Sequence, residues 1–333
     1  MKVLLVDIDS KMPNLALMKV SAYHKREGDE VGWAWANPDR VYISCIFSEN
    51  LPNARGVAKF YPGADVKIGG PALGYPNSLP DEIEHIMPDY ALYLGLDYSM
   101  GFSTRGCIRE CPFCIVPAIE GKFREHAPIS EFHNPSFDKL MLLDNNFLAS
   151  VRWREKLDYI GGHGLKVSFN QGLDARLVDD GKAIALAETQ SYNSHFTSRK
   201  YYFAWDLMES EESVLRGIQK MIDVGVSPQR IMVYMLVGFN TSHEQDYHRF
   251  SRLRELDVEP FVMIYNNRRD DPWIRYFARW VNRPWFYKNF DFVDYDRLPP
   301  SLRKETESIL EAEKLSTSKQ VGKPVRARMR KNY

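Results

Sequence analysis

Cysteine is scarce in this chain, and its scarcity excludes one class of proteins. Four cysteines among 333 residues are too few for the disulfide framework of a small secreted domain. The sequence also lacks an apolar run of about 18 residues that could span a bilayer, and no stretch of it resembles a signal peptide. We therefore expect a protein of the reducing cytoplasm that does not insert into a membrane.

The chain as a whole also has no net formal charge, because 44 Lys and Arg balance 44 Asp and Glu. The balance is uneven along the sequence. Residues 314–333 hold seven Lys or Arg and no acid, which leaves 37 basic and 44 acidic residues, a formal charge of −7, in the remainder. We interpret residues 301–333 as a helical and basic flexible tail. Such a tail could contact the phosphates of nucleic acid.

Strand and helix patterns alternate along the chain and predict an α/β fold. Buried strands are expected from apolar runs at residues 2–7, 41–47, 65–70, 90–96, 139–144, 165–170, 200–206, 230–239 and 259–266. Amphipathic helical stretches separate several of them, at residues 14–27, 209–225 and 243–257. This rhythm is typical of βαβ units with parallel sheets. A proline-rich stretch, residues 71–88, precedes a domain boundary that we place near residue 95.

Three of the four cysteines stand together in "GCIRECPFC", where Cys107, Cys111 and Cys114 are spaced C-x3-C-x2-C. Three thiolates at this spacing can converge on one metal centre. A zinc site would need a fourth ligand, which His126 or His133 could supply. A cubane iron–sulfur cluster held by three cysteines instead keeps one iron open. An open coordination position is a property of catalytic metal sites, whereas structural sites are closed.

The motif resembles the signature of the radical S-adenosylmethionine (SAM) enzymes, which share the glycine before the first cysteine and the aromatic residue before the third. The resemblance implies a 4Fe–4S cluster bound by the three cysteines, with SAM on the open iron and Phe113 near its adenine. It implies reductive cleavage of SAM to a 5′-deoxyadenosyl radical, which abstracts hydrogen from a substrate that the sequence does not identify. An electron donor such as flavodoxin or ferredoxin is implied as a partner.

The order of the elements resembles the subgroup of this superfamily that carries a cobalamin-binding-like domain in front. This resemblance implies a Rossmann-like (flavodoxin-like) domain over residues 1–95 and a partial (β/α)6 TIM-like barrel over residues 96–300, followed by the tail. We do not expect cobalamin, because the loop D-x-H-x-x-G has Ala22 in place of Asp before His24. We interpret the front domain as degenerate and His24 as a helix-surface residue. Cys45, alone in a strand run, is expected to be a small buried apolar residue.

Further cofactor contacts are expected where strands end, because ligands of such barrels meet the carboxyl ends of the strands. The resemblance assigns Asn145 and Asn146 to the methionine end of SAM and Arg176 to its carboxylate. From their places at strand ends, we expect Asn170 to contact ligand atoms and Asp206 to contact the ribose. The segment around Gly238 resembles one of the same subgroup, which implies close approach of backbone to the adenosine there. Ordinary structural roles remain open at these positions: an Asn-rich turn, a salt bridge of Arg176 with Asp179 or Asp180, a helix N-cap at Asp206 and a simple turn at Gly238.

Two other functions stay open at this point. The chain could be a non-catalytic iron–sulfur or zinc-binding module that contacts nucleic acid, or a radical SAM enzyme that modifies nucleic acid or a nucleotide. Arginines interleave with aromatics over residues 266–290, and such side chains can stack on bases. However, Trp273, Phe277 and Trp280 have the spacing of a buried helix face, so we predict that they lie in the core.

Overall fold

The computed structural model describes residues 1–267 and 270–321. Its contacts divide the chain into two compact units. The first comprises residues 1–202 and 223–225, and the second comprises residues 203–222 and 226–333. Both units combine helices with strands, and parallel pairing joins strands in each of them. The expected α/β class is therefore confirmed, while the expected domain boundaries stay a prediction.

The first unit begins with a four-stranded parallel sheet. Its strands are β1 (Lys2–Asp7), β2 (Glu30–Gly32), β3 (Arg40–Ser44) and β4 (Asp65–Gly69), and their order across the sheet is β2-β1-β3-β4. The three strands predicted in this region are confirmed. The edge strand β2 was not predicted, because three residues are too few to show a hydrophobic period.

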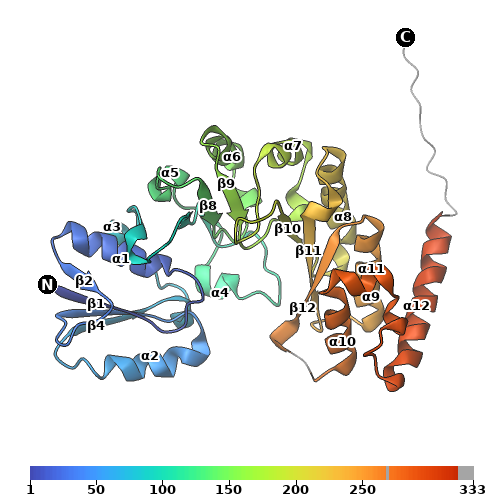
Figure 1. Cartoon of the computed structure of the whole chain (residues 1–333), viewed down its shortest axis with the longest axis horizontal. Helices are drawn as coiled ribbons and strands as arrows, with labels where there is room; N and C mark the ends of the chain where they lie inside the picture. The colour runs from blue at the N-terminus through green and yellow to red at the C-terminus, as the bar shows by residue number, and fades with distance from the viewer. Residues whose placement is uncertain (268–269, 322–333) are drawn as a thin grey trace, which may run out of the picture. The chain divides into compact units, whose positions relative to one another are not determined.

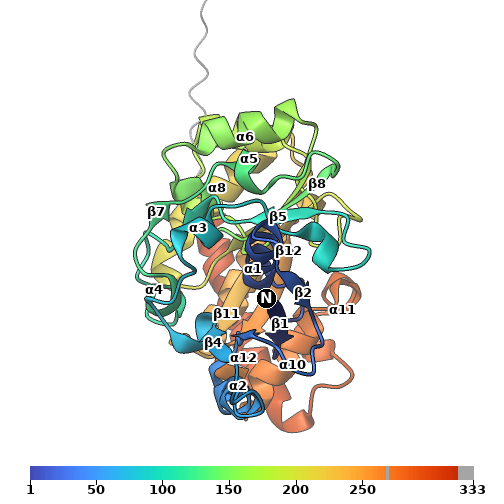
Figure 2. The ribbon, with the colours of Figure 1, turned by 90° about the vertical axis from the view of Figure 1, so that its left-hand side faces the viewer.

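Helices cover both faces of this sheet. α1 (Leu15–Arg26) and α2 (Leu51–Ala58) lie on opposite sides of the strands (Figures 1 and 2). Successive residues of a strand face opposite ways, so Val3 and Leu5 join the core with α1, whereas Leu4 joins the core beside α2. α1 begins where the Asn14 side chain accepts a hydrogen bond from the backbone of Leu17, as a helix N-cap does.

A second parallel sheet follows in the first unit. Its strands, in the order β5-β8-β9, are β5 (Ser99–Gly101), β8 (Lys139–Leu142) and β9 (Lys166–Phe169). The predicted strands at residues 139–144 and 165–170 are confirmed. The helices of this part are α3 (Asp81–Glu84), α4 (Val116–Glu120), α5 (Ile129–Phe132), α6 (Trp153–Gly162) and α7 (Asp180–Glu188).

The strand predicted at residues 90–96 is wrong. A 3-10 turn (Tyr90–Leu92) forms there instead, and the strand comes later, at β5. The buried Tyr90 hydroxyl explains the difference, since it accepts a hydrogen bond from the backbone N–H of Met100 in β5. The aromatic and apolar residues of this stretch thus pack beside the sheet rather than within it.

The second unit holds the sheet β10-β11-β12, formed by β10 (Tyr201–Ala204), which begins in the first unit, β11 (Ile231–Val237) and β12 (Glu259–Ile264). All three strands were predicted, as were α8 (Glu211–Asp223) and α9 (His243–Glu255). α9 begins with a capping box, in which Ser242 and Gln245 bond each other's backbone. The remaining helices are α10 (Pro272–Val281), α11 (Pro284–Asn289) and α12 (Pro300–Val321).

The aromatic stripe of α10 is part of the core, as its spacing predicted. Trp273, Phe277 and Trp280 are each exposed by 1% or less. Phe250 of α9 packs against Phe277, and Tyr287 of α11 packs against Trp280. These side chains therefore present no platform for stacking bases. The basic residues 322–333 of the expected tail lie outside the described residues. No described helix combines the length and the apolar character that crossing a bilayer requires.

Two single-residue expectations for the front sheet had different outcomes. Cys45 is fully buried, as predicted. His24 is also buried, with 1% exposure, so its interpretation as a helix-surface residue is wrong. Its two ring nitrogens lie 2.6 Å from Asp29 Oδ2 and 3.0 Å from the hydroxyl of Tyr42. These polar partners make the burial of an imidazole favourable, and neither is visible in the helical pattern around His24.

Candidate functional site

The three clustered cysteines lie on one loop of the first unit, downstream of β5. A two-residue antiparallel pairing closes the base of this loop, between β6 (Thr104–Arg105) and β7 (Arg124–Glu125). Arg105 reinforces the closure through a bidentate ion pair with Glu120. Gly106 precedes the first cysteine with a φ of +69°, and a Cβ there would lie 2.4 Å from the carbonyl oxygen of Lys122. Only glycine fits such a position without displacing backbone.

Within the loop, a tight turn joins the second and third cysteines, Cys111 and Cys114. The N–H of Cys114 donates to the carbonyl of Cys111 over 2.9 Å, which forms a tight turn around Phe113. The sulfur of Cys107 accepts from the backbone N–H of Arg109 at 3.3 Å. All three cysteines and Phe113 are partly accessible. The loop therefore offers its thiols to an incoming group rather than burying them.

The segment after β8 approaches the loop from a second side. Asp144 is buried and accepts hydrogen bonds from the backbone and hydroxyl groups of both Ser103 and Thr104, at 2.6–3.1 Å. Two residues further on, the side-chain amide of Asn146 donates to the sulfur of Cys107 at 3.4 Å. The other polar atom of this side chain, Asn146 Oδ1, is buried and has no hydrogen-bond partner within the described residues. The end of β8 thus supplies an anchor and an unused acceptor beside the first cysteine.

Asp174, after β9, connects the site from the third strand. Its carboxylate accepts from Arg176 Nε at 2.6 Å and from Arg109 Nε at 3.0 Å, and the amide of Asn146 lies 3.4 Å away. Burial by itself would raise the pKa of Asp174, but the two guanidinium groups outweigh burial and hold that pKa below its usual range. The carboxylate is therefore ionised at neutral pH and ties the cysteine loop to the end of β9.

Neither Asp174 nor Arg109 was identified from the sequence. Asp174 stands two residues before Arg176, and an acid so close to an arginine in an expected loop was the available signal. Asn145 and Asn170 contribute less, because the described structure gives neither side chain a hydrogen bond. The backbone N–H of Asn170 donates to Leu142. The structure thus brings Asn146 to the cysteine loop and links Arg176 to it through Asp174.

Asp206 and Gly238 belong to the second unit and follow β10 and β11. Asp206 accepts a hydrogen bond from the backbone of Leu236 at 3.1 Å, so it joins the ends of two strands. Gly238 has a φ of +77°, and a Cβ there would lie 3.0 Å from Ile274. The positive φ is a backbone reason for glycine that requires no ligand. The roles predicted for both residues toward SAM stay predictions.

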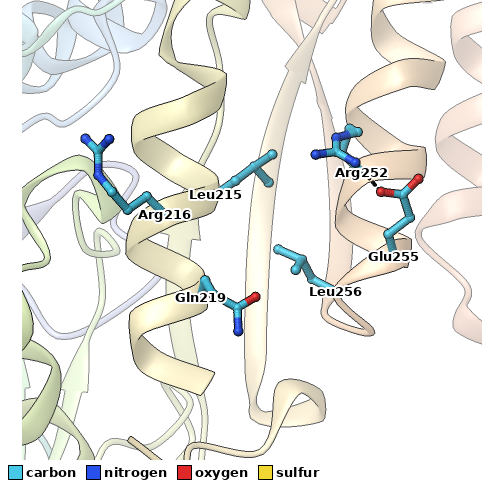
Figure 3. A pocket seen from close by; sticks show the side chains of 6 residues that line it. All are labelled: Leu215, Arg216, Gln219, Arg252, Glu255 and Leu256. Atoms are coloured by element: carbon cyan, nitrogen blue, oxygen red, sulfur yellow. Dashed lines mark hydrogen bonds and ion pairs between the residues drawn. The ribbon is translucent and has the colours of Figure 1, made fainter. Parts of the chain in front are cut away.

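The second unit also has a small hollow of about 270 Å³ between α8 and α9. Figure 3 shows Leu215 and Leu256 pointing into it from the two helices, with the ion pair between Arg252 and Glu255 at its rim. None of the residues expected to bind a cofactor lines this hollow. The candidate site is therefore the cysteine loop and its neighbours.

The two histidines that could complete a zinc site have other partners. His126 is held 3.0 Å from Glu84 and His133 3.0 Å from the hydroxyl of Tyr159, so both histidines have partners other than the cysteines. Within residues 1–267 and 270–321, no three His, Cys, Asp or Glu side chains are grouped to hold a metal ion. A single ion requires such a grouping. In a cubane cluster each thiolate bonds a different iron, which spreads the ligands further apart.

Comparison with known proteins adds no assignment. No protein-family model matches the chain, and no curated protein matches its sequence. The function must therefore be argued from the residues and contacts given above.

Proposed function

We propose that the chain is a radical SAM enzyme, which binds a 4Fe–4S cluster through Cys107, Cys111 and Cys114 and cleaves SAM reductively to start hydrogen abstraction from a substrate. We further propose that residues 1–95 form a flavodoxin-like domain and that the later strands belong to a partial (β/α)6 barrel. The order β2-β1-β3-β4 supports the first assignment, because it is the order of the flavodoxin-like sheet.

One observation carries the proposal: polar side chains from the ends of two parallel strands meet the cysteine loop that follows a third. Asn146 follows β8 and Asp174 follows β9, and both contact residues of the loop. Ligands of open α/β sheets bind outside the carboxyl ends of the strands. A thiol-rich loop at this edge, stabilised by buried polar contacts, has the features of a cofactor site rather than those of a chance grouping of cysteines.

The surrounding residues have distinct tasks in this proposal. When bound, the cluster supplies the electron that breaks a carbon–sulfur bond of SAM. The amide of Asn146 and the backbone N–H of Arg109 donate to the Cys107 sulfur, which reduces the negative charge that a thiolate concentrates there. Asn146 Oδ1, which has no partner in the part of the chain that the structure describes, could accept a hydrogen bond from a ligand. Asp174 fixes Arg109 and Arg176, so the loop and the end of β9 keep one arrangement.

The test is anaerobic reconstitution with iron and sulfide, followed by an assay with SAM and dithionite. We expect a brown protein with about four irons and four sulfides per chain, which releases 5′-deoxyadenosine. Cys111→Ala should lose the cluster and the product. Cys45→Ala is the matched control, because Cys45 is buried in the first sheet among apolar residues and should leave both readouts unchanged.

A colourless protein after reconstitution would refute the proposal, as would 5′-deoxyadenosine formation that survives the loss of Cys111. Zinc bound in place of iron by anaerobically purified protein would favour the binding-module alternative. Candidate substrates enter a second stage, in which deuterium from the correct one appears in the 5′-deoxyadenosine.

A further inference from the structure

A large cavity lies in the first unit. It has a volume of about 1060 Å³, and no cysteine lines it. Its walls are the loop after β1 (residues 10–14), one face of α1, the ends of β3 and β4, and residues 75–85; a further wall comes from residues around the base of the cysteine loop. Cavities of this volume take organic ligands of moderate size.

The position of the cavity in the first sheet favours a ligand. In the order β2-β1-β3-β4, the chain connections leave β1 and β3 in opposite directions, which makes the space beyond these two strands the topological switch point. Residues 10–14 follow β1, and Ser44 and Phe47 lie at the end of β3; all of them line the cavity. Open parallel sheets bind their ligands at such switch points.

Some cations on the cavity wall have no ion-pair partner in the described residues. Lys11 and Lys67 make no hydrogen bond or ion pair within the described part of the chain, and each ammonium lies 5.8 Å from an aromatic ring centre, Phe47 for Lys11 and Tyr42 for Lys67. Arg124 donates to the backbone carbonyls of Glu120 and Lys122 and has no ion pair in the described residues. Three cations on the cavity wall are therefore without an ion-pair partner in the described part of the chain.

The acids on the wall are mostly neutralised. Glu84 is hydrogen-bonded to His126 and accepts from Lys19 and Arg105. The His126 hydrogen bond and these two cations hold the Glu84 pKa well below its usual range although burial opposes the shift. Glu120 pairs with Arg105 as well, and Glu125 pairs with a lysine outside the cavity. Asp81 lines the wall without an ion pair in the described residues, so three unpaired cations less one unpaired acid leave an excess of +2.

Uncharged hydrogen-bonding groups lie at the same end as Lys11. The buried amide of Asn14 donates to the hydroxyls of Ser10 and Ser44, which leaves both hydroxyl hydrogens available as donors. The same Asn14 begins α1, a helix of 12 residues whose N-terminal end carries partial positive charge. Ammonium groups, hydroxyls and a helix N-terminus together suit a phosphate group.

We propose that this cavity binds a phosphate-bearing metabolite of about nucleotide size. The phosphate lies against Lys11, Lys67 and the start of α1. The remainder of the ligand lies against the apolar wall, which includes Leu17 and Ile83. This proposal rests on the cavity alone and holds whether or not the cysteines bind a cluster.

The test is equilibrium binding to the full chain at low salt, with AMP, ribose 5-phosphate, inorganic phosphate and adenosine as probes. AMP should bind most tightly, because it offers both a phosphate and an apolar ring, and added salt should weaken it. The double variant Lys11→Gln/Lys67→Gln should lose at least about tenfold in AMP affinity. Lys59→Gln/Lys304→Gln is the matched control, since it removes two exposed lysines that do not line the cavity.

Three outcomes would overturn the proposal. One is that no phosphorylated probe binds saturably at millimolar concentration. Another is that adenosine binds as tightly as AMP, which would make the phosphate irrelevant. The third is that both double variants bind AMP like the wild-type chain, which would place the phosphate elsewhere. Because the readout is binding to protein without iron, a failure here is distinct from a failure of the cluster proposal.

Discussion

Replacing Asp174 by Asn tests whether this carboxylate holds the cysteine loop to the end of β9. The variant keeps the shape of the side chain but removes the charge that pairs with Arg109 and Arg176. The carboxylate is 7% exposed, while the two arginines are 33% and 25% exposed. Charge-assisted hydrogen bonds contribute about 1.5–3 kcal/mol each, and partial solvation of the arginines reduces the sum. We expect a loss of about 3 kcal/mol in the free energy of unfolding.

The loss of stability in Asp174→Asn should depend on pH. The pKa of Asp174 is lowered on folding, so the ion pairs stabilise the protein above the pKa of an unfolded aspartate, about 3.9, and this contribution fades as the pH falls further through the lower folded value. The difference between wild type and Asp174→Asn should therefore be full at pH 7 and shrink below pH 4.

Urea unfolding followed by circular dichroism measures both quantities. Asp138→Asn is the matched control, because Asp138 also pairs with a cation, Lys166, but is 63% exposed. Surface pairs contribute about 0–1 kcal/mol, so this control should change the stability little. A loss in Asp174→Asn no larger than in the control, or one that is independent of pH, would refute the reasoning.

Three further outcomes are expected. Trp280→Ala should cost about 3–5 kcal/mol in chemical unfolding, since the ring is fully buried, and a cost below 1 kcal/mol would contradict the packing of α10. Flanking carboxylates raise the pKa of His243 although burial opposes the shift. The stability that these carboxylates add should be lost as the pH rises above 6.5 through the folded pKa. His243→Asn should remove this pH dependence of the unfolding midpoint. In reconstituted protein, Asn146→Ala should make the cluster potential more negative by a few tens of millivolts, because one hydrogen bond of about 1 kcal/mol to the Cys107 sulfur is lost. Asn145→Ala, which removes no such bond, is the control in potentiometry, and equal potentials in both variants would contradict the assignment.

Local patterns predicted most of the regular structure. Buried strands such as β1 and β11 are short apolar runs bounded by polar residues, and the spacing of the aromatic residues in α10 predicts a buried face. These features depend on side-chain period alone, which any local window of the sequence contains. The strand predicted at residues 90–96 failed because a tyrosine in it bonds the backbone of the true strand, and a local window does not contain that contact.

The candidate site, too, could be predicted from the sequence only in part. The sequence by itself determined that three cysteines share one short segment with a glycine before them, because their separation along the chain is part of the primary sequence. Only the tertiary structure decided that Asn146 reaches Cys107 and that Asp174 pairs with Arg109, 65 residues away. The carboxyl ends of parallel strands meet at one edge of a sheet whatever their separation along the chain, and which polar side chains meet there depends on how the strands are ordered and packed.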